Sequence, residues 1–207
     1  MKSLGKPVLQ SGLGLAQVDT GNANLGKSKF AGPVLNLRDE LSSVVHHQGI
    51  VKTLSFLDEK DTQRFATQLA AQPALKNALV KIHGDLGAGK TTLVRYLLRA
   101  LGITGRIKSP TYAVVEPYEL PNLNIWHFDF YRFNDPREWE EAGFRDIFAS
   151  PGLKLVEWPE KAQGYLPQAD LEVDLQVEPD QTRRVLLKAN TSSGSSLISD
   201  IDGRGAA

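Results

Sequence analysis

The most constraining feature of the sequence is a glycine-rich turn between an apolar segment and a helical one. Residues 84–92 read Gly-Asp-Leu-Gly-Ala-Gly-Lys-Thr-Thr, which matches the pattern G-x-x-x-x-G-K-[ST]. Three glycines let the backbone wrap closely, so that several N–H groups converge on anionic phosphate oxygens. Lys90 then places an ammonium near the β- and γ-phosphates, and the Thr91 hydroxyl can ligate Mg²⁺. The same string also occurs in ordinary turns, so its surroundings decide its meaning.

The segments on both sides of the turn have the periodicity that a phosphate-binding loop requires. Leu79, Val80 and Ile82 give a short strand before it. Apolar residues at helical spacing follow as far as Leu101, and Gly102 stands where glycine commonly ends a helix. The positive end of that helix dipole points at the same anion. The order of strand, loop and helix therefore predicts a nucleotide site.

Composition excludes several classes of protein. The 207 residues allow one domain with a sizeable core plus tails, and 41% of them are hydrophobic. No apolar run approaches the ~20 residues of a spanning helix, so we expect no membrane contact. The formal net charge of zero argues against a strongly basic nucleic-acid-binding surface acting alone. The chain has no cysteine, which excludes disulfides and is consistent with a cytoplasmic protein.

The chain divides into three parts. Residues 1–50 are rich in glycine, serine, asparagine and lysine without a sustained period, and we interpret them as a disordered N-terminal extension. Their excess of lysine leaves open an organellar transit peptide, or a start codon assigned too far upstream. Residues 51–189 carry regular patterns and are predicted to form the nucleotide-binding domain. Residues 190–207 are dominated by serine, glycine and aspartate, which predicts a flexible tail.

The central part is predicted to be an α/β fold with a mixed, mainly parallel sheet flanked by helices. Strands are predicted at 51–56, 78–83, 112–116, 124–129, 153–158, 171–177 and 185–187. Helices are predicted at 59–70, 90–101, 136–143 and 145–149. Asp58 is the expected N-cap of the first helix, and Pro73 closes it. The last two strands alternate about a turn at 179–181, which predicts a C-terminal β-hairpin at the end of the sheet.

Two acidic residues are predicted to end buried strands, at Asp129 and at Glu157. Ligands of a parallel sheet gather at the carboxyl ends of its strands, and a phosphate loop needs acids there to hold Mg²⁺ and the attacking group. Ser109 and Thr111 follow the loop helix and could sense a γ-phosphate, although Ser-Pro-Thr is also an ordinary turn. His127 is interpreted as a residue that packs or hydrogen-bonds within its strand rather than as a base.

Four segments together resemble the TsaE (YjeE) family, the small ATPase of bacterial threonylcarbamoyladenosine synthesis on tRNA. They are 83–92, 108–112, 127–132 and 156–161, and the likeness covers about 51–189. The resemblance implies a P-loop ATPase domain that uses ATP and Mg²⁺ and acts with the TsaD and TsaB proteins. Those proteins transfer a threonylcarbamoyl group to adenosine 37 of tRNAs reading codons that begin with A, so contact with tRNA would be indirect.

The resemblance also implies roles for residues. The phosphates would be held by the loop residues Asp85, Leu86, Gly87, Ala88, Gly89, Lys90, Thr91 and Thr92. Thr91 and Glu157 would ligate Mg²⁺. Lys90 and Asp129 would be the catalytic pair: Lys90 would stabilise the β–γ bridge, and Asp129 would orient or polarise the attacking water. The domain alone is expected to be slow, with its partners completing the site.

Three further nucleotide contacts follow from the resemblance. Thr111 would lie in a switch-like loop, Trp158 would line the base, and Arg183 would approach from the C-terminal hairpin. The family usually begins near the first strand. Residues 1–50 are therefore a departure that bears on localisation or start site and not on the core.

Alternative functions share the same loop. A small-molecule kinase would need an arginine-bearing lid, and no compact arginine-rich insertion follows Lys90. A GTPase would need an Asn-Lys-x-Asp segment to read guanine, which the sequence lacks. A nucleotide-binding module that organises a complex without turnover stays open, because the same residues would bind in either case.

Overall fold

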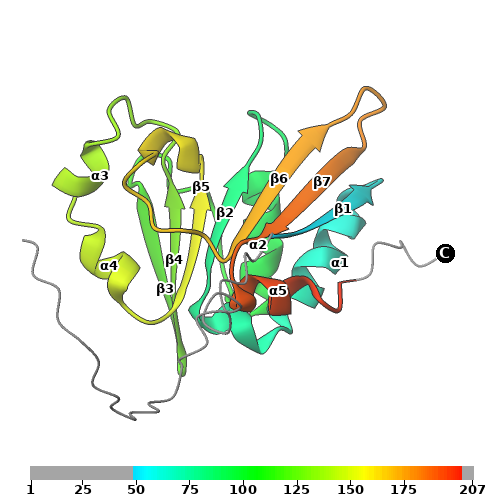
Figure 1. Ribbon diagram of the computed structural model, residues 1–207, viewed down its shortest axis with the longest axis horizontal. Coiled ribbons are helices and arrows are strands. Elements are labelled where there is room, and N and C mark those ends of the chain that lie inside the picture. Colours follow the sequence, from blue (N-terminus) through cyan, green and yellow to red (C-terminus); the bar gives the residue numbers. More distant parts are fainter. Residues whose placement is uncertain (1–48, 202–207) are drawn as a thin grey trace, which may run out of the picture. The chain divides into compact units, whose positions relative to one another are not determined.

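The computed structural model describes residues 49–201, which form a seven-stranded mixed sheet with helices packed on it (Figure 1). The strands are β1 (Ile50–Phe56), β2 (Leu79–His83), β3 (Val115–Leu120), β4 (Leu123–Asp129), β5 (Leu153–Glu157), β6 (Leu171–Val177) and β7 (Arg183–Ala189). The α-helices are α1 (Glu59–Ala70), α2 (Lys90–Ala100), α3 (Glu138–Glu141), α4 (Arg145–Ala149) and α5 (Ser192–Ile198). Two 3₁₀ helices are η2 (Pro73–Asn77) and η3 (Pro159–Ala162). The predicted α/β class is confirmed, whereas the disorder predicted before residue 49 concerns residues outside the described range.

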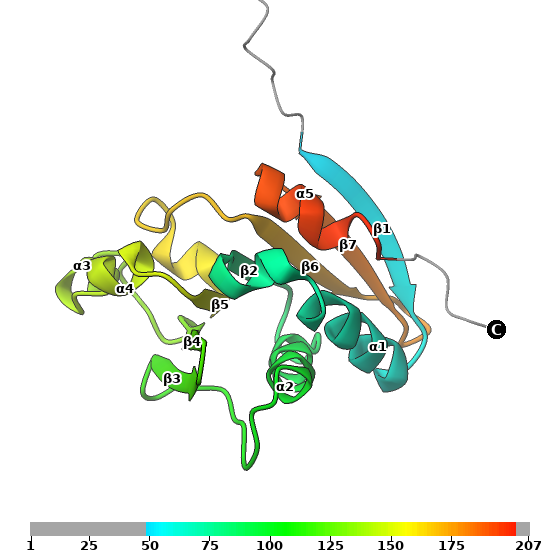
Figure 2. The ribbon, with the colours of Figure 1, turned by 90° about the horizontal axis from the view of Figure 1, so that it is seen from below.

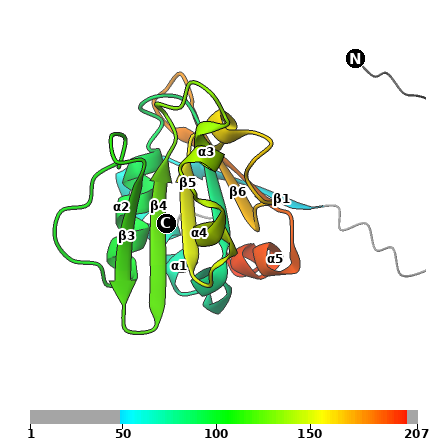
Figure 3. The ribbon, with the colours of Figure 1, turned by 90° about the vertical axis from the view of Figure 1, so that its left-hand side faces the viewer.

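The centre of the sheet is parallel and its margins are antiparallel. The strand order is β1-β7-β6-β2-β5-β4-β3, and β6, β2, β5 and β4 run parallel. On one side β3 pairs antiparallel with β4 (Figure 3), and on the other β7 pairs antiparallel with both β6 and β1. The C-terminal hairpin β6–β7 is thus present, but the prediction that it ends the sheet is wrong. Strand β1 forms that edge, because a hairpin pattern does not say which other segment takes its free side.

Helices α1 and α2 lie on one face of the sheet and α3 and α4 on the other (Figure 2), and each face carries its own hydrophobic cluster. The larger packs α1 and α2 on one face, over residues such as Val80, Ile82 and Leu155. The smaller gathers Phe128 and Val156 with residues of α3 and α4. Because successive strand residues point to opposite faces, the neighbours of Phe128 and Val156 along β4 and β5 face α2. This alternation directs the two predicted acids toward the phosphate loop.

The capping residues predicted for the start of α1 and the end of α2 are present. The Asp58 side chain accepts hydrogen bonds from the N–H groups of Lys60 and Asp61 at 2.8 and 3.2 Å, as expected of an N-cap. At the end of α2, Gly102 has φ +103°. The N–H of Ile103 donates to a carbonyl of the last helical turn at 2.9 Å, which satisfies the helix end. No helix among residues 49–201 has both the length and the apolar character needed to cross a membrane.

Two predicted elements differ from the structure in their bounds. The strand predicted from residue 112 begins only at Val115, because Val114 has φ +67° and turns the chain out of the extended conformation. The helix predicted over 136–143 is reduced to the four residues of α3. Gly143 then adopts φ +72° and separates α3 from α4.

The tail predicted after residue 189 is instead ordered as far as Ile201. The Thr191 hydroxyl caps α5 by accepting a hydrogen bond from the Gly194 N–H at 3.0 Å. Leu197 and Ile198 are buried, and the helix packs against β7 and η2. The serine-rich composition was misleading because α5 gains its stability from docking a few apolar residues rather than from helix propensity. Residues 202–207 lie outside the described range.

Gly194→Ala is expected to destabilise the protein by about 3 kcal/mol, because the added methyl group would be forced into a site that is already packed. A Cβ at this position would lie 1.9 Å from the backbone oxygen of Asp170. The measurement is the midpoint of urea unfolding, with the exposed Ser196→Ala of the same helix as control. Equal stability of the two variants would mean that α5 is not docked as described.

Candidate functional site

The glycine-rich turn joins β2 to α2 at the carboxyl edge of the parallel strands (Figure 1). Its glycines at 84, 87 and 89 have φ values of +133°, +81° and +111°, so the predicted positive φ values are confirmed. Gly84 is required for a second reason. A Cβ there would lie 2.4 Å from the backbone oxygen of Leu175 on the neighbouring β6. The loop is therefore held close to the sheet, with α2 starting directly behind it.

Lys90 lies at the centre of the loop and is buried. Its Nζ donates hydrogen bonds to the carbonyl oxygens of Gly84 and Asp85 at 2.5 and 2.8 Å. The Trp158 ring covers the same atom, with 3.8 Å between Nζ and the ring centroid. Trp158 reaches this position because its backbone leaves β5 with φ +55°. The ammonium is therefore fixed by the loop's own carbonyls and by one aromatic face.

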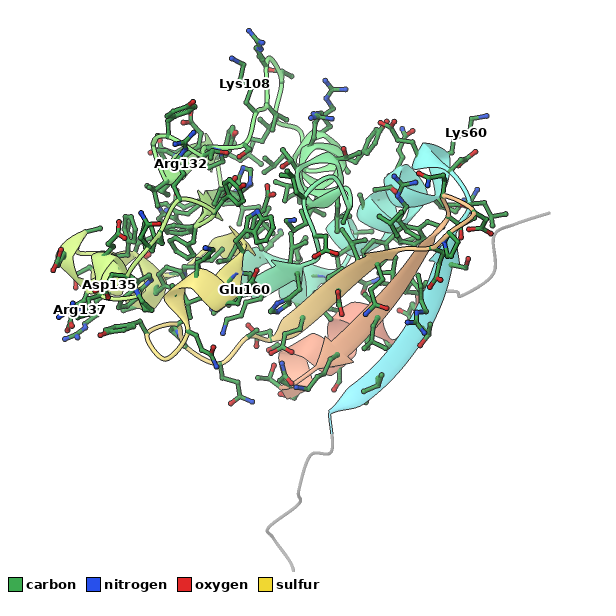
Figure 4. The ribbon with its side chains drawn as sticks, turned by 90° about the horizontal axis from the view of Figure 1, so that it is seen from above. Lys60, Lys108, Arg132, Asp135, Arg137 and Glu160 are labelled. Atoms are coloured by element: carbon green, nitrogen blue, oxygen red, sulfur yellow. The ribbon has the colours of Figure 1, made fainter. Side chains whose placement is uncertain are left out.

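Burial lowers the pKa of Lys90, because the charged ammonium is taken out of water. The nearby carboxylates of Glu157, Glu160 and Asp129 oppose this shift. Glu160 belongs to η3 and lies beside the carboxyl edge of the sheet (Figure 4). A partly desolvated ammonium attracts a multiply charged anion more strongly than an exposed one does, because less water screens it.

Thr91 and Glu157 are brought into direct contact, as the resemblance implied. The Thr91 hydroxyl donates to Oε2 of Glu157 at 2.9 Å. The other carboxylate oxygen, Oε1, is 2.8 Å from Nε2 of His127. Glu157 and His127 are both buried. The expectation that His127 hydrogen-bonds from its strand is thus confirmed, and its partner is the predicted metal ligand.

Asp129 is surrounded by hydroxyl groups from the segment between α2 and β3. The Thr111 hydroxyl donates to its Oδ2 at 2.9 Å, and the Ser109 hydroxyl donates to the same oxygen. The two hydroxyl oxygens are 2.5 Å apart. The N–H of Tyr131 donates to Oδ1 at 3.0 Å. The Ser-Pro-Thr segment is therefore anchored on the acid and is not a free turn.

Most predicted site residues meet in one cleft of about 370 Å³, named here the acidic cleft. It runs along the side of the loop that faces β4 and β5. Its walls include Lys90, Thr91, Thr111, Asp129, Glu157 and Trp158. Among residues 49–201 no three His, Cys, Asp or Glu side chains are grouped as an all-protein metal cage. One carboxylate and one hydroxyl beside a phosphate loop are a donor set that suits Mg²⁺, which takes its other ligands from phosphates and water.

Arg183 does not reach the acidic cleft. It lines a second cleft of about 210 Å³ on the other side of the loop, together with Asp58, Glu59 and Thr62 from the start of α1. Gly87 and Gly89 border both clefts. The three α1 residues were missed by sequence reasoning, which used Asp58 only as a helix cap. Nothing in the order of the chain shows that the start of α1 faces the loop.

Comparison with known proteins assigns the chain to a family. A family model described as threonylcarbamoyl adenosine biosynthesis protein TsaE matches residues 56–185. The chain belongs to the TsaE family. The match spans the loop, both acids and the start of β7, so each predicted TsaE motif lies within it. The resemblance inferred from four short segments is thereby confirmed.

Individual proteins similar to this chain carry the same family name. The tRNA threonylcarbamoyladenosine biosynthesis protein TsaE of Haemophilus influenzae is 44% identical over 137 residues, or 66% of this chain and 86% of that protein. The Bacillus subtilis protein of the same name is 33% identical over 133 residues, or 64% and 82%. The crystal structure of Bacillus subtilis YdiB superposes with a TM-score of 0.62 at 25% identity, covering 74% of this chain and 95% of that one. The predicted P-loop NTPase-like fold is confirmed, and the chain is of a nucleotide-binding type.

Proposed function

We propose that this TsaE-family chain binds ATP with Mg²⁺ and hydrolyses it in support of threonylcarbamoyladenosine synthesis on tRNA. The observation that carries the proposal is the convergence of Lys90, Thr91, Glu157 and Asp129 in the acidic cleft. The names of the Haemophilus influenzae and Bacillus subtilis relatives support the tRNA pathway. ATP rather than GTP is favoured because the guanine-reading segment is absent from the sequence.

The clefts on the two sides of the loop support one orientation of the nucleotide. Its backbone N–H groups and the start of α2 would hold the phosphates, with Lys90 Nζ exchanging carbonyl partners for phosphate oxygens. The γ-phosphate belongs in the acidic cleft, where the metal ligands and Asp129 are. The nucleoside would then occupy the second cleft beside Arg183, whose side chain can approach the phosphates from there. Trp158 lines the acidic cleft and covers Lys90, so this orientation does not use the predicted contact between Trp158 and the base.

The donor set of Thr91 and Glu157 would hold Mg²⁺, whose role is to neutralise charge on the β- and γ-phosphate oxygens. Lys90 would add a second positive charge at the β–γ bridge. Asp129 would orient the attacking water, because among residues 49–201 its Oδ1 accepts a hydrogen bond from the Tyr131 N–H alone and retains a lone pair for a water hydrogen. Thr111, bound to the other oxygen, would connect the state of the site to the segment between α2 and β3.

Two large apolar side chains are exposed at or beside the acidic cleft, which supports completion of the site by partner proteins. Leu86 and Tyr112 are 76% and 86% exposed although both adjoin the nucleotide-binding residues. The segment that carries Tyr112 also carries Lys108 at its outer tip (Figure 4). Arg132 stacks on the Tyr112 ring, with 4.1 Å between the guanidinium carbon and the ring centroid. We propose that TsaD and TsaB cover this rim and exclude water from the site.

Phosphate release by the purified chain is expected to be slow and to rise at least tenfold when TsaD, TsaB and tRNA are added. The physical reason is that a water-excluded site strengthens every electrostatic contact to the transferring phosphoryl group. Steady-state phosphate release with and without the partners measures this. Equal rates would contradict activation by the partners, and failure of the folded chain to bind ATP with Mg²⁺ in calorimetry would contradict the function itself.

A binding module without turnover is the second candidate function. Its support is the saturation of Asp129 Oδ2 by two hydroxyl groups, which would also suit an acid that only anchors a loop. In that case the charge of Asp129 would not matter for any chemical step. Substitution of Asp129 by Asn separates the two functions.

A further inference from the structure

His127 lies beneath the proposed metal site and is completely buried. Its Nε2 is 2.8 Å from Oε1 of Glu157, while its Nδ1 has no hydrogen-bond partner among the described residues. We propose that His127 is a positioning residue that holds the Glu157 carboxylate in the orientation needed to bind Mg²⁺. The inference rests on the proposed function, since it concerns the metal of the same site.

The contact follows from the register of two parallel strands. His127 pairs with Leu155 and Asp129 pairs with Glu157, across β4 and β5. Paired residues and residues two apart share a face, so His127 and Glu157 are diagonal neighbours on the face that carries α2. The imidazole therefore approaches the carboxylate from inside the sheet, while Thr91 approaches from the loop side.

The unpartnered nitrogen indicates where the proton lies. Burying an N–H donor without an acceptor costs folding free energy, and burying a ring nitrogen that carries no proton costs less. The donor proton is therefore assigned to Nε2, which donates it to Oε1 of Glu157. The buried carboxylate is then held at both oxygens, by His127 at Oε1 and by the Thr91 hydroxyl at Oε2. Oε1 is fixed inward, which leaves Oε2 and the Thr91 oxygen as the pair that faces the acidic cleft.

Loss of the His127 donor should weaken the metal site without weakening the phosphate loop. Partners that orient metal ligands typically change metal affinity by about 10- to 100-fold when removed. The loop contacts of Lys90 do not involve His127. If His127 only filled space, its substitution would not weaken Mg²⁺ binding while leaving metal-free nucleotide binding unchanged.

The test compares His127→Asn with His127→Gln. The amide nitrogen of Gln can reach the place of Nε2, whereas the shorter Asn cannot, so only Gln restores the donor. Binding of a fluorescent ATP analogue is measured against Mg²⁺ concentration, and again in EDTA. We expect His127→Asn to raise the Mg²⁺ concentration for half-maximal binding about 10- to 100-fold and His127→Gln to remain within about threefold of the native chain. Affinity in EDTA should be the same in all three within about twofold.

Two results would overturn the inference. The first is that His127→Asn needs the same Mg²⁺ concentration for half-maximal binding as the native chain. The second is that His127→Asn loses as much nucleotide affinity in EDTA as it does in Mg²⁺. If His127→Asn does not melt cooperatively, His127→Leu fills the ring volume without a donor and carries the same two outcomes. A native chain whose nucleotide binding ignores Mg²⁺ would instead refute the proposed function, so the two failures are distinguishable.

Discussion

Asp129→Asn is expected to lower the rate of ATP hydrolysis about 1,000-fold, within the range that positioned acid–base groups contribute. The amide keeps the shape of the carboxylate, and its single oxygen can still accept hydrogen bonds from Ser109 and Thr111. The NH₂ group that replaces Oδ1 cannot accept from the Tyr131 N–H or from a water molecule. The amide also lacks the negative charge needed to orient and polarise a water molecule. Phosphate release in the presence of TsaD, TsaB and tRNA measures the loss, and nucleotide affinity should stay within about threefold of the native value.

The matched control is Asp135→Asn, which removes a carboxylate from the same connection after β4. Asp135 is paired with Arg137 at the protein surface, well outside both clefts (Figure 4). Its removal should leave hydrolysis unchanged. Full turnover by Asp129→Asn would show that this acid anchors the Ser-Pro-Thr segment and nothing more, which would favour the module without turnover.

Lys90→Ala is expected to weaken ATP binding about 100-fold, or about 2.7 kcal/mol. The substitution removes a partly desolvated ammonium that would contact the phosphates, and no other Lys or Arg of residues 49–201 lines the acidic cleft. Lys90 also donates to two loop carbonyls, so its loss loosens the loop itself. Calorimetric titration with ATP and Mg²⁺ measures the change in affinity.

Lys76→Ala is the control for this variant. Lys76 is an exposed lysine of η2, before β2 and so at the opposite end of that strand from the loop. The substitution removes the same charge from the chain and should not alter ATP affinity. Equal affinity of Lys90→Ala and the native chain, with both melting alike, would mean that the phosphates bind elsewhere.

The local parts of the site were predictable because their chemistry is encoded in consecutive residues. The positive φ values of the loop glycines, the Asp58 cap and the start of α2 at Lys90 all follow from residue types at fixed offsets. Periodicity placed Asp129 and Glu157 at strand ends for a similar reason. The strand predicted from residue 112 was placed too early in the chain, because an alternation pattern does not report the positive φ of Val114.

Features that depend on segments far apart in the chain were not predictable. The contact between His127 and Glu157 needs the register of β4 against β5, and the second cleft needs the start of α1 to meet Arg183. Composition failed at α5, where buried Leu197 outweighs a serine-rich sequence. In each case the deciding term is packing between distant elements, which no local pattern reports.

By itself the sequence determined that a phosphate loop follows a strand, that two acids end other strands, and that the chain resembles the TsaE family. These features reside in short segments whose backbone conformation depends on glycine, proline and apolar spacing. Only the tertiary structure decided which oxygen of Glu157 faces the loop and on which side of the loop Arg183 lies. It also decided that β1 forms an edge of the sheet. The physical reason is that strand order and register are set by the burial of whole faces, and those faces are assembled from residues distant in the chain.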